Sequence, residues 1–429
     1  MSQNQPHLRR KGIAIVCALL LISGCGLIDG TTNAGPATAP PSAPPQTTPP
    51  SAPSETPTPT PGETPTPIPT ASDTPSAGWP ELIAADRTGV ARIAVTSCQS
   101  AGAGTGFLVD DTHIVTAAHV IVGAAGITIG VNGQVVTATV EGINVAEDVA
   151  LLKIDQPVTG HHFEFAAEDP PEGTEVSVLG YPLGENFASD SGHISGLNRQ
   201  YSPVFNGIGH ITQTDTAING GNSGGPLVTM DGKVVGIVKS TRIGTLDNGV
   251  VTRRDIQSTN YVVSGKFAKT LVDAWLAASP STPLATCTAN ALPTNNQIAV
   301  TVDTPDERGM QVAQSLLIHG QAINGGAYDL AYRMFTPAAQ QEQGGIATWS
   351  QGMDTSYWQA IDIGNIASTA PGTITANVSL QTTQSAAKGP DGQTCSIWHM
   401  QYTMVWASVW WEISEATSTM PTDPCPAGP

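Results

Sequence analysis

Three residues in three separate motifs could together carry out nucleophilic catalysis. Ser223 stands in AINGGNSGGPLV, His119 in VTAAHV and Asp148 in AEDVALLKID. A serine hydroxyl attacks a carbonyl only when a base within hydrogen-bond reach takes its proton and a carboxylate orients that base. Alone, each motif has a simpler explanation: a glycine-rich turn, an ordinary histidine or a strand cap. Together, in the order His, Asp, Ser, they predict a catalytic triad.

The elements that must position these residues are short strands. Residues 81 to about 280 alternate Val/Ile-rich runs with Gly, Asp and Asn breaks, which predicts an all-β barrel or sandwich. Hairpin turns are expected at VNG (131–133) and MDG (230–232). The run SGKFAKTLVDAWLAAS, 264–279, spaces its apolar residues as a helix does and predicts one closing helix.

Longer strings around the triad carry a family resemblance. GTGFLVDDTHIVTAAHV, DVALLK, TDTAINGGNSGGPLV and GKVVGIV closely resemble the signatures of trypsin-like (chymotrypsin-fold) serine proteases, most of all the bacterial HtrA/Deg branch. The resemblance covers residues 85–277 and implies a double β-barrel. The triad order also argues against a subtilisin or an α/β-hydrolase. The PDZ domain that HtrA-type proteases usually carry after the barrel is not predicted here.

The resemblance implies a role for each matching residue. His119 is expected to act as general base and then acid, Asp148 to orient it, and Ser223 to act as the nucleophile. The backbone N–H groups of Gly221 and Ser223 match the donors of the oxyanion hole. Gly224 then helps the chain turn from the nucleophile into a buried strand.

The expected substrate pocket lies beside the nucleophile. Ala217 and Ile218 would form its floor, and Val238 and Lys239 would contribute to its wall. No acidic residue stands at its base to attract Arg or Lys. We therefore expect cleavage after small or medium apolar residues.

Residues 1–25 predict an export signal, with three basic residues before a 13-residue run of apolar and small residues. Such a run is too short for the roughly 20 residues that span a bilayer. The ending ISGC resembles the lipobox of bacterial lipoproteins, which implies diacylation of Cys25; the alternative is a plain signal peptide cleaved near Gly26 or beyond. Two acyl chains would anchor the protein stably to the outer face of the bacterial cell membrane.

Residues 26–80 contain no Lys or Arg and are dominated, from Pro36 onward, by Pro, Thr, Ser and Ala. Such a composition buries too little apolar surface to fold, so we predict a disordered tether.

The net charge of −18, from 17 basic and 35 acidic residues, argues against nucleic-acid partners. No CxxC or HExxH spacing occurs, so no metal or other cofactor is expected, and HHFEF (161–165) is expected to be a solvated loop.

Four cysteines remain besides the one in the signal and the lipid site Cys25: Cys98, Cys287, Cys395 and Cys425. An even number in an exported protein indicates two disulfides, for which three pairings exist. We expect Cys98–Cys287 to tie the front of the barrel to the segment after its last helix. Cys395–Cys425 would clamp the C-terminal tail.

A second domain is predicted over residues 295–429, after a linker at 281–294. It holds six of the eight tryptophans and therefore needs its own core. Residues 306–341 predict a helix, a Gly-Gly break and a second short helix, whereas 372–384 and 395–414 predict long strands, with alternate residues from Trp398 to Trp406 on one face. This α+β pattern resembles the cone-shaped fold of the nuclear transport factor and SnoaL superfamily, which hosts both enzymes and ligand-binding modules.

The sequence as a whole favours a membrane-anchored, extracytoplasmic serine endopeptidase that cuts proteins or peptides through an acyl-enzyme. Its C-terminal domain would bind a ligand or regulate the protease. The alternative is a catalytically silent cell-surface binding protein that uses the barrel as a scaffold and the C-terminal domain as the ligand-binding module. The complete triad favours the peptidase. The sequence predicts no oligomeric state.

Overall fold

The computed structural model describes residues 78–98, 100–199, 210–243, 255–286 and 298–426, which belong to one compact unit, Ser72–Pro429. The predicted export signal with Cys25, the tether up to residue 77, and Cys287 lie outside the described residues. Helix α1 (Trp79–Asp86) begins inside the last two residues assigned to the tether. Among the described residues, no helix is long and apolar enough to cross a membrane.

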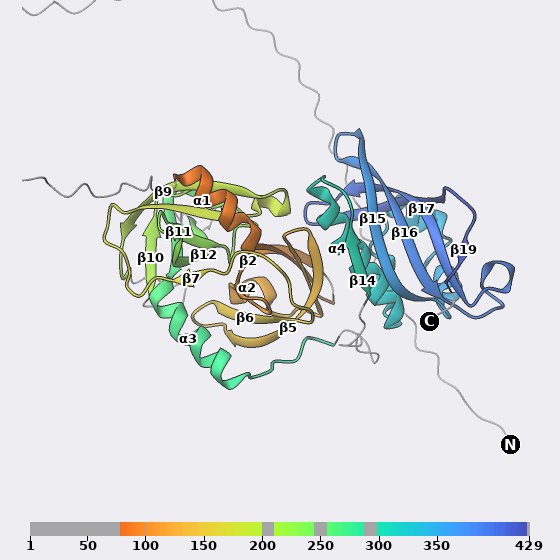
Figure 1. Cartoon of the computed structure of the whole chain (residues 1–429), viewed down its shortest axis with the longest axis horizontal. Helices are drawn as coiled ribbons and strands as arrows, with labels where there is room; N and C mark the ends of the chain where they lie inside the picture. Colours follow the sequence, from red (N-terminus) through yellow and green to blue (C-terminus); the bar gives the residue numbers. More distant parts are fainter. Residues whose placement is uncertain (1–77, 99, 200–209, 244–254, 287–297, 427–429) are drawn as a thin grey trace, which may run out of the picture. The chain divides into compact units, whose positions relative to one another are not determined.

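Six antiparallel strands close the first barrel in the order β1-β2-β3-β6-β5-β4 (Figure 1). Apolar side chains of alternating positions fill its interior. The predicted VNG turn joins β4 to β5 with Asn132 and Gly133 both at positive φ, 46° and 75°, as a tight hairpin requires. The strands are β1 (Val90–Thr96), β2 (Ala101–Asp110), β3 (His113–Thr116), β4 (Gly126–Val131), β5 (Gln134–Asn144) and β6 (Val149–Ile154).

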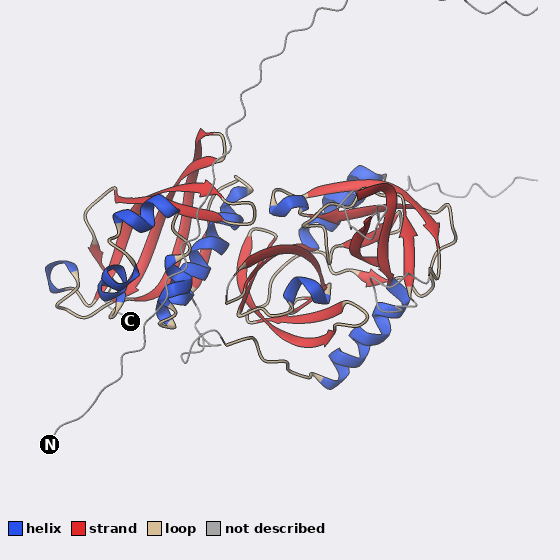
Figure 2. Ribbon diagram, turned by 180° about the vertical axis from the view of Figure 1, so that it is seen from behind, coloured by secondary structure: helices blue, strands red, loops and turns tan. Residues whose placement is uncertain are grey.

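The second barrel has the strand order β11-β8-β9-β10-β13-β12 and is closed by pairing of β11 with β12, while the short β7 joins β12 in parallel. Figure 2 shows the strands of both barrels in red. The predicted MDG turn connects β11 to β12. Two closed barrels confirm the predicted all-β double-barrel fold. The strands are β7 (Glu164–Phe165), β8 (Glu175–Gly180), β9 (Ala188–Gly196), β10 (Ile211–Thr214), β11 (Pro226–Thr229), β12 (Lys233–Ile243) and β13 (Asp255–Ser264).

Helix α3 (Gly265–Ala278) is the closing helix expected from the sequence. It begins where the Ser264 hydroxyl accepts a hydrogen bond from the backbone N–H of Phe267, which caps the first turn. Its apolar stripe packs against the core that the two barrels share. The remaining short helices of this region are η1 (Arg87–Gly89), α2 (Ala118–Ile121) and η2 (Pro182–Gly184).

The C-terminal region is an α+β domain, as predicted. Its sheet has the order β14-β15-β16-β17-β18, with β19 paired to β17, and α4 packs against β15. Gly325 and Gly326 separate α4 from α5 at the expected break. The elements are β14 (Ala299–Val302), α4 (Arg308–Asn324), α5 (Tyr328–Tyr332), α6 (Pro337–Glu342), α7 (Ile346–Met353), β15 (Tyr357–Ala370), β16 (Thr373–Thr383), η5 (Pro390–Gly392), β17 (Cys395–Trp406), β18 (Trp411–Ser418) and β19 (Asp423–Pro424).

Residues 395–414 were predicted to form a single long strand, and the structure differs from this prediction. The segment forms two strands, β17 and β18, joined by a turn over residues 407–410. The turn contains Ser408 at φ 69°, a conformation more typical of glycine. The face prediction is confirmed, because the alternating side chains of β17 all belong to or pack against one core: Trp398, Met400, Tyr402, Met404 and Trp406.

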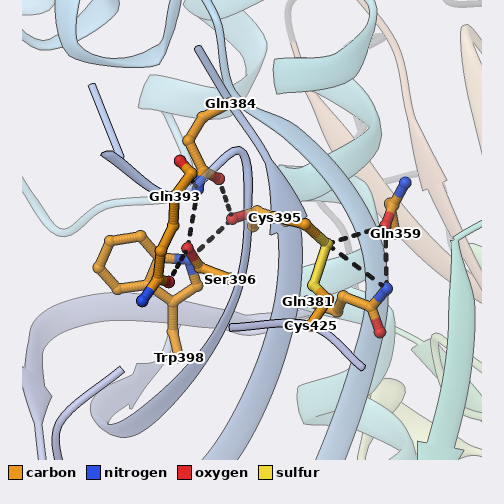
Figure 3. Close-up of a disulfide and its surroundings, with 9 residues drawn as sticks. Gln359, Gln381, Gln384, Gln393, Cys395, Ser396, Trp398 and Cys425 are labelled. Atoms are coloured by element: carbon orange, nitrogen blue, oxygen red, sulfur yellow. Dashed lines mark hydrogen bonds between the residues drawn. A yellow bond between two sulfur atoms is a disulfide. The ribbon is translucent and has the colours of Figure 1, made fainter. Parts of the chain in front are cut away.

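A disulfide joins Cys395, at the start of β17, to Cys425 in the tail (Figure 3). It therefore clamps the tail as expected. Next to it, the Gln384 side-chain amide donates to the Ser396 hydroxyl at 2.8 Å. The expected Cys98–Cys287 pairing lies outside the described residues, because Cys287 is not described.

Arg92 on β1 joins the first barrel to segments distant in the sequence. Its side chain is fully buried, and its three nitrogens donate to Gly184 O at 2.9 Å, Gln314 Oε1 at 2.6 Å and Val409 O at 2.5 Å. Burial lowers the pKa of Arg92 to about 10, so the guanidinium stays charged at neutral pH. A buried guanidinium is tolerated because its donors are satisfied.

Candidate active site

The turn that carries Ser223 requires glycine on both sides of the serine. Gly221 and Gly224 adopt φ 95° and 85°, in the left-handed region that L side chains rarely enter. A Cβ at Gly221 would lie 2.3 Å from the carbonyl oxygen of Tyr181, and one at Gly224 would lie 2.2 Å from that of Thr105. Steric contact and backbone conformation therefore both select glycine here.

Thr105 of β2 holds this turn from the first barrel. Its backbone N–H donates to Ser223 O at 2.8 Å, and its hydroxyl donates to Gly221 O at 2.7 Å. The Thr116 hydroxyl in turn donates to Thr105 O at 2.7 Å. The sequence did not predict a role for Thr105, although its place in the motif GTGFLV is the signal that marks it.

Hydrogen bonds to the carbonyl oxygens of Gly220 and Asn222 orient the two peptide groups that carry the N–H groups of Gly221 and Ser223. Gly220 O accepts from Leu183 N at 2.5 Å, and Asn222 O accepts from Gly225 N at 2.9 Å. The C=O and N–H of a trans peptide point in opposite directions, so the N–H groups of Gly221 and Ser223 point away from these contacts. Among the described residues, neither N–H donates to a backbone acceptor. Both donors therefore stay available to an incoming oxygen atom.

His119 and Asp148 are in direct contact. The ring Nδ1 lies 2.9 and 3.0 Å from the two carboxylate oxygens, and the backbone N–H of His119 also donates to Oδ1 at 2.9 Å. Asp148, directly before β6, is 4% exposed, whereas the His119 side chain is 47% exposed. A carboxylate that accepts from Nδ1–H leaves Nε2 unprotonated, which is the form a general base needs.

Lys239 completes the surroundings of Asp148. Its Nζ lies 2.8 Å from Asp148 Oδ2, and both side chains are buried. Burial alone would raise the pKa of Asp148, but the hydrogen bonds and charges of His119 and Lys239 hold it below its usual range. Asp148 therefore stays ionised. Lys239 was expected in the pocket wall, and its ammonium contacts the Asp148 carboxylate.

The other three predicted pocket residues differ in their exposure. Ile218 and Val238 are buried in one apolar cluster of the second barrel, whereas Ala217, directly before Ile218 in the chain, is exposed. The Ser223 hydroxyl lies 3.4 Å from the carbonyl oxygen of Lys239, directly after Val238 in β12. Strand β12, which carries Val238 and Lys239, thus borders the turn that carries Ser223.

A cleft of about 560 Å³ opens beside Gly221. Part of its wall comes from the turn between β17 and β18 of the C-terminal domain, a contribution that the sequence did not predict. Its lining residues are Ala103, Leu183, Gly184, Glu185, Gly220, Gly221, Trp406, Ser408 and Val409.

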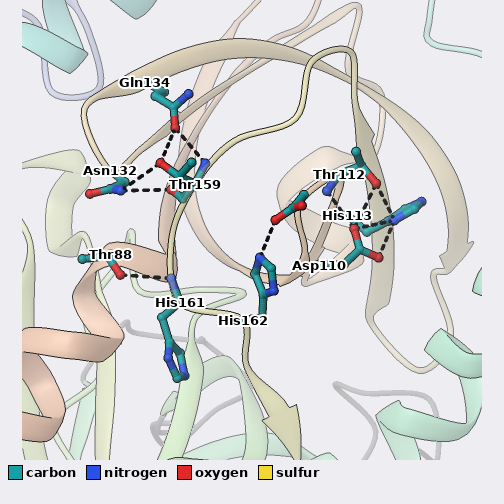
Figure 4. Close-up of polar contacts among 10 residues, drawn as sticks. Thr88, Asp110, Thr112, His113, Asn132, Gln134, Thr159, His161 and His162 are labelled. Atoms are coloured by element: carbon teal, nitrogen blue, oxygen red, sulfur yellow. Dashed lines mark hydrogen bonds and ion pairs between the residues drawn. The ribbon is translucent and has the colours of Figure 1, made fainter.

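Other histidines of the first barrel pair with carboxylates of their own (Figure 4). His113 Nδ1 lies 2.8 Å from Asp110, and His162 lies 2.9 Å from Asp111. Within the described ranges, no group of three or more His, Cys, Asp or Glu side chains could hold a metal ion. The prediction of HHFEF as a solvated loop was wrong in part, because Phe163 is buried 5.5 Å from the ring of Phe107.

The region that contains this site matches a known protein family. The family model described as "Trypsin-like peptidase domain" matches residues 104–237, which include His119, Asp148 and Ser223. The chain carries a trypsin-like peptidase domain. This confirms the resemblance predicted for the barrel region.

Relatives of the peptidase domain are named as serine proteases. A "Probable periplasmic serine endoprotease DegP-like" of Halomonas elongata is 39% identical over 141 residues, 31% of this chain and 28% of that protein. "Serine protease Rv3671c" of Mycobacterium tuberculosis is 32% identical over 159 residues, 36% of this chain and 40% of that protein. The crystal structure of the active form of Rv3671c protease covers 54% of this chain and 98% of its own, at 27% identity and a TM-score of 0.40. This chain thus spans less than half the length of these two curated relatives.

Proposed function

We propose that the chain is an extracytoplasmic serine endopeptidase of the HtrA/Do type. The observation that carries the proposal is the contact of the buried Asp148 carboxylate with Nδ1 of His119, in the same domain as a glycine-bounded serine turn. The names of the relatives support the same activity.

The mechanism follows from these groups. Ser223 Oγ forms a bond to the carbonyl carbon of the substrate while its proton passes to His119 Nε2, and Asp148 stabilises the resulting imidazolium. The carbonyl oxygen becomes an oxyanion, to which the N–H groups of Gly221 and Ser223 donate. The C–N bond then breaks, and the amine leaves with the proton from His119. Water, deprotonated by the same imidazole, releases the acyl group and restores Ser223.

Specificity for small or medium apolar residues is part of the proposal. The apolar character of Ile218 and Val238 supports it, and a cleavage profile dominated by Arg or Lys would overturn it. The cleft beside Gly221 is expected to receive the part of the substrate that leaves with the amine.

We also propose that Cys25 carries the lipid that holds the protein at the outer face of the cell membrane, with residues 26–80 as a tether. The sequence motif ISGC supports this anchor. The C-terminal domain is then an accessory module that binds a ligand or regulates the peptidase, and its fold is expected to be of the nuclear transport factor and SnoaL type. Metabolic labelling with a fatty-acid probe, lost in Cys25→Ala, tests the anchor.

A fluorophosphonate probe tests the catalytic proposal, because it reacts with an activated serine. We expect the full chain to be labelled, and Ser223→Ala and His119→Ala to lose the label. The assay includes a denatured protein substrate and several pH values. A chain that neither labels nor cleaves under any of these conditions would support the alternative, a catalytically silent surface binding protein.

A further inference from the structure

Lys239 is a cation buried against the carboxylate that orients the catalytic histidine. We propose that Lys239 is a positioning residue, which holds Asp148 against His119 and sets the lower pH limit of catalysis. The inference rests on the proposed peptidase function. It concerns a residue for which sequence reasoning predicted only a place in the pocket wall.

The geometry divides the carboxylate of Asp148 between two partners. Oδ2 accepts from Lys239 Nζ at 2.8 Å and lies 2.9 Å from His119 Nδ1, while Oδ1 accepts from the backbone N–H of His119 at 2.9 Å. The side chains of Lys239 and Asp148 are only 7% and 6% exposed. Water therefore screens this pair weakly, and the carboxylate cannot rotate without losing contacts.

The backbone of the same residue borders the nucleophile. Ser223 Oγ lies 3.4 Å from Lys239 O, and Gly224 N donates to the carbonyl of the preceding Val238 at 2.8 Å. Strand β12 thus runs beside the turn that presents the serine. Lys239 contacts the orienting acid with its ammonium and the nucleophile with its carbonyl.

A positive charge at this place has a defined effect on His119. The negative charge of Asp148 favours the imidazolium, and a nearby ammonium offsets part of that attraction. The ammonium therefore weakens the stabilisation that Asp148 alone would give to a positive charge on the imidazole ring. Because a buried carboxylate that loses one partner is strongly destabilised, Lys239 also keeps Asp148 ionised as the pH falls.

Titratable groups also lie on the neighbouring elements. They include Glu147, in the turn before β6, the exposed Lys153 of β6, and Tyr261, buried on β13, which pairs with β12. One carboxylate oxygen of Glu147 is buried and has no hydrogen-bond partner among the described residues. Glu147 and Tyr261 stay unchanged in every variant below, so differences between variants report on Lys239.

The test compares Lys239→Met, which keeps an unbranched side chain one atom shorter and removes its charge, with Lys239→Arg, which keeps the charge. Lys153→Met, which removes an exposed lysine of β6, is the matched control. We expect the acid limb of kcat/KM against pH to move up by about 1 unit in Lys239→Met. Lys239→Arg should restore most of the parent profile, and Lys153→Met should leave it unchanged.

A second readout does not need activity. The imidazole of His119 is titrated by NMR in the full chain carrying Ser223→Ala, with and without Lys239→Met. We expect the NMR titration curve of the ring to move to higher pH when the lysine is removed, because the charge of Asp148 is then no longer offset. If Lys239→Met does not fold, Lys239→Gln replaces it. An unchanged acid limb and an unchanged His119 titration in a folded variant would overturn the proposal, whereas an unlabelled parent chain would contradict only the peptidase function.

Discussion

The hydroxyl of Thr105 donates to the carbonyl oxygen of Gly221 at 2.7 Å, across the boundary between the two barrels. Thr105 belongs to β2 of the first barrel, and Gly221 lies in the turn that leads into β11 of the second. The same hydroxyl accepts from the backbone N–H of Tyr181 at 3.0 Å. One fully buried side chain thus fixes the peptide groups around Ser223 relative to the barrel that carries His119.

The variant Thr105→Val tests this relationship, because it keeps the shape of the side chain and removes the hydroxyl. Gly221 O loses its donor and Tyr181 N–H loses its acceptor. We expect kcat/KM to fall about 10- to 100-fold, equivalent to about 1–3 kcal/mol. Thr139→Val, at an exposed position of β5, is the control and should keep parent activity. Activity within twofold of the parent in folded Thr105→Val would contradict the role.

Two neighbouring glycines provide a sharper comparison. A Cβ at Gly220 meets no atom within 4 Å, whereas one at Gly221 would lie 2.3 Å from Tyr181 O at a residue with φ 95°. Gly221→Ala must therefore move the peptide whose N–H we assign to the oxyanion hole, and we expect a loss of about 100-fold or more in kcat. Gly220→Ala should stay close to the parent. Equal activities, measured on one peptide substrate, would argue against this oxyanion donor.

The parts of the site that could be predicted from the sequence are those encoded locally. The turn around Ser223 depends on glycine conformation, and the barrel strands depend on alternation and on turn residues such as Asn132-Gly133. The contact between Lys239 and Asp148 joins residues 91 positions apart. A buried lysine also departs from the rule that lysine stays exposed. No local pattern indicated this contact.

In the C-terminal domain, the turn between β17 and β18 was not predicted, because no local sequence signal marks it. Residues 407–410 contain no glycine, asparagine or proline, so nothing in their composition marked a turn. The positive φ is adopted by Ser408 instead. Helices α6 and α7 were also missed, because each spans no more than eight residues and carries too few turns for a clear helical period.

His319 should make the C-terminal domain sensitive to acid. It is buried on α4 beside Phe335, Trp349 and Trp358, its Nδ1 lies 3.0 Å from Ala331 O, and burial lowers its pKa to about 4. The unfolded chain has a pKa near 6.5 and so binds this proton first. Stability is therefore constant above about pH 7 and falls as the pH drops from 6.5 to 4, by about 3 kcal/mol in total.

The free energy of unfolding, followed by tryptophan fluorescence between pH 4 and 8, measures this effect. We expect His319→Gln to flatten the slope between pH 6.5 and 4, even if it lowers stability at pH 7. His162→Gln, at an exposed histidine of the peptidase domain, should leave the slope unchanged. A parent slope that persists in His319→Gln would assign the acid sensitivity to other groups.

The disulfide between Cys395 and Cys425 closes a loop with a sequence separation of 30. Loop-closure entropy for that length corresponds to about 3–4 kcal/mol of stability. We expect the double variant Cys395→Ser, Cys425→Ser to lose about this much free energy of unfolding, so that its denaturation midpoint falls, while fluorophosphonate labelling of Ser223 continues. An unchanged midpoint in denaturant would show that the tail contributes nothing to the stability of this domain.

Arg92 should influence both stability and substrate binding. Its side chain donates to Gly184 O and Val409 O, and both of these residues line the cleft beside Gly221. Arg92→Met keeps the bulk of the side chain but leaves buried carbonyls without donors, so we expect a loss of about 3 kcal/mol in unfolding free energy.

KM for a peptide that extends into the cleft should rise more than the labelling rate falls, since the small probe does not reach the cleft. Arg87→Met, which removes a half-exposed ion pair with Glu307, should cost less than about 1 kcal/mol. Equal effects of the two variants on KM would mean that Arg92 does not shape the cleft.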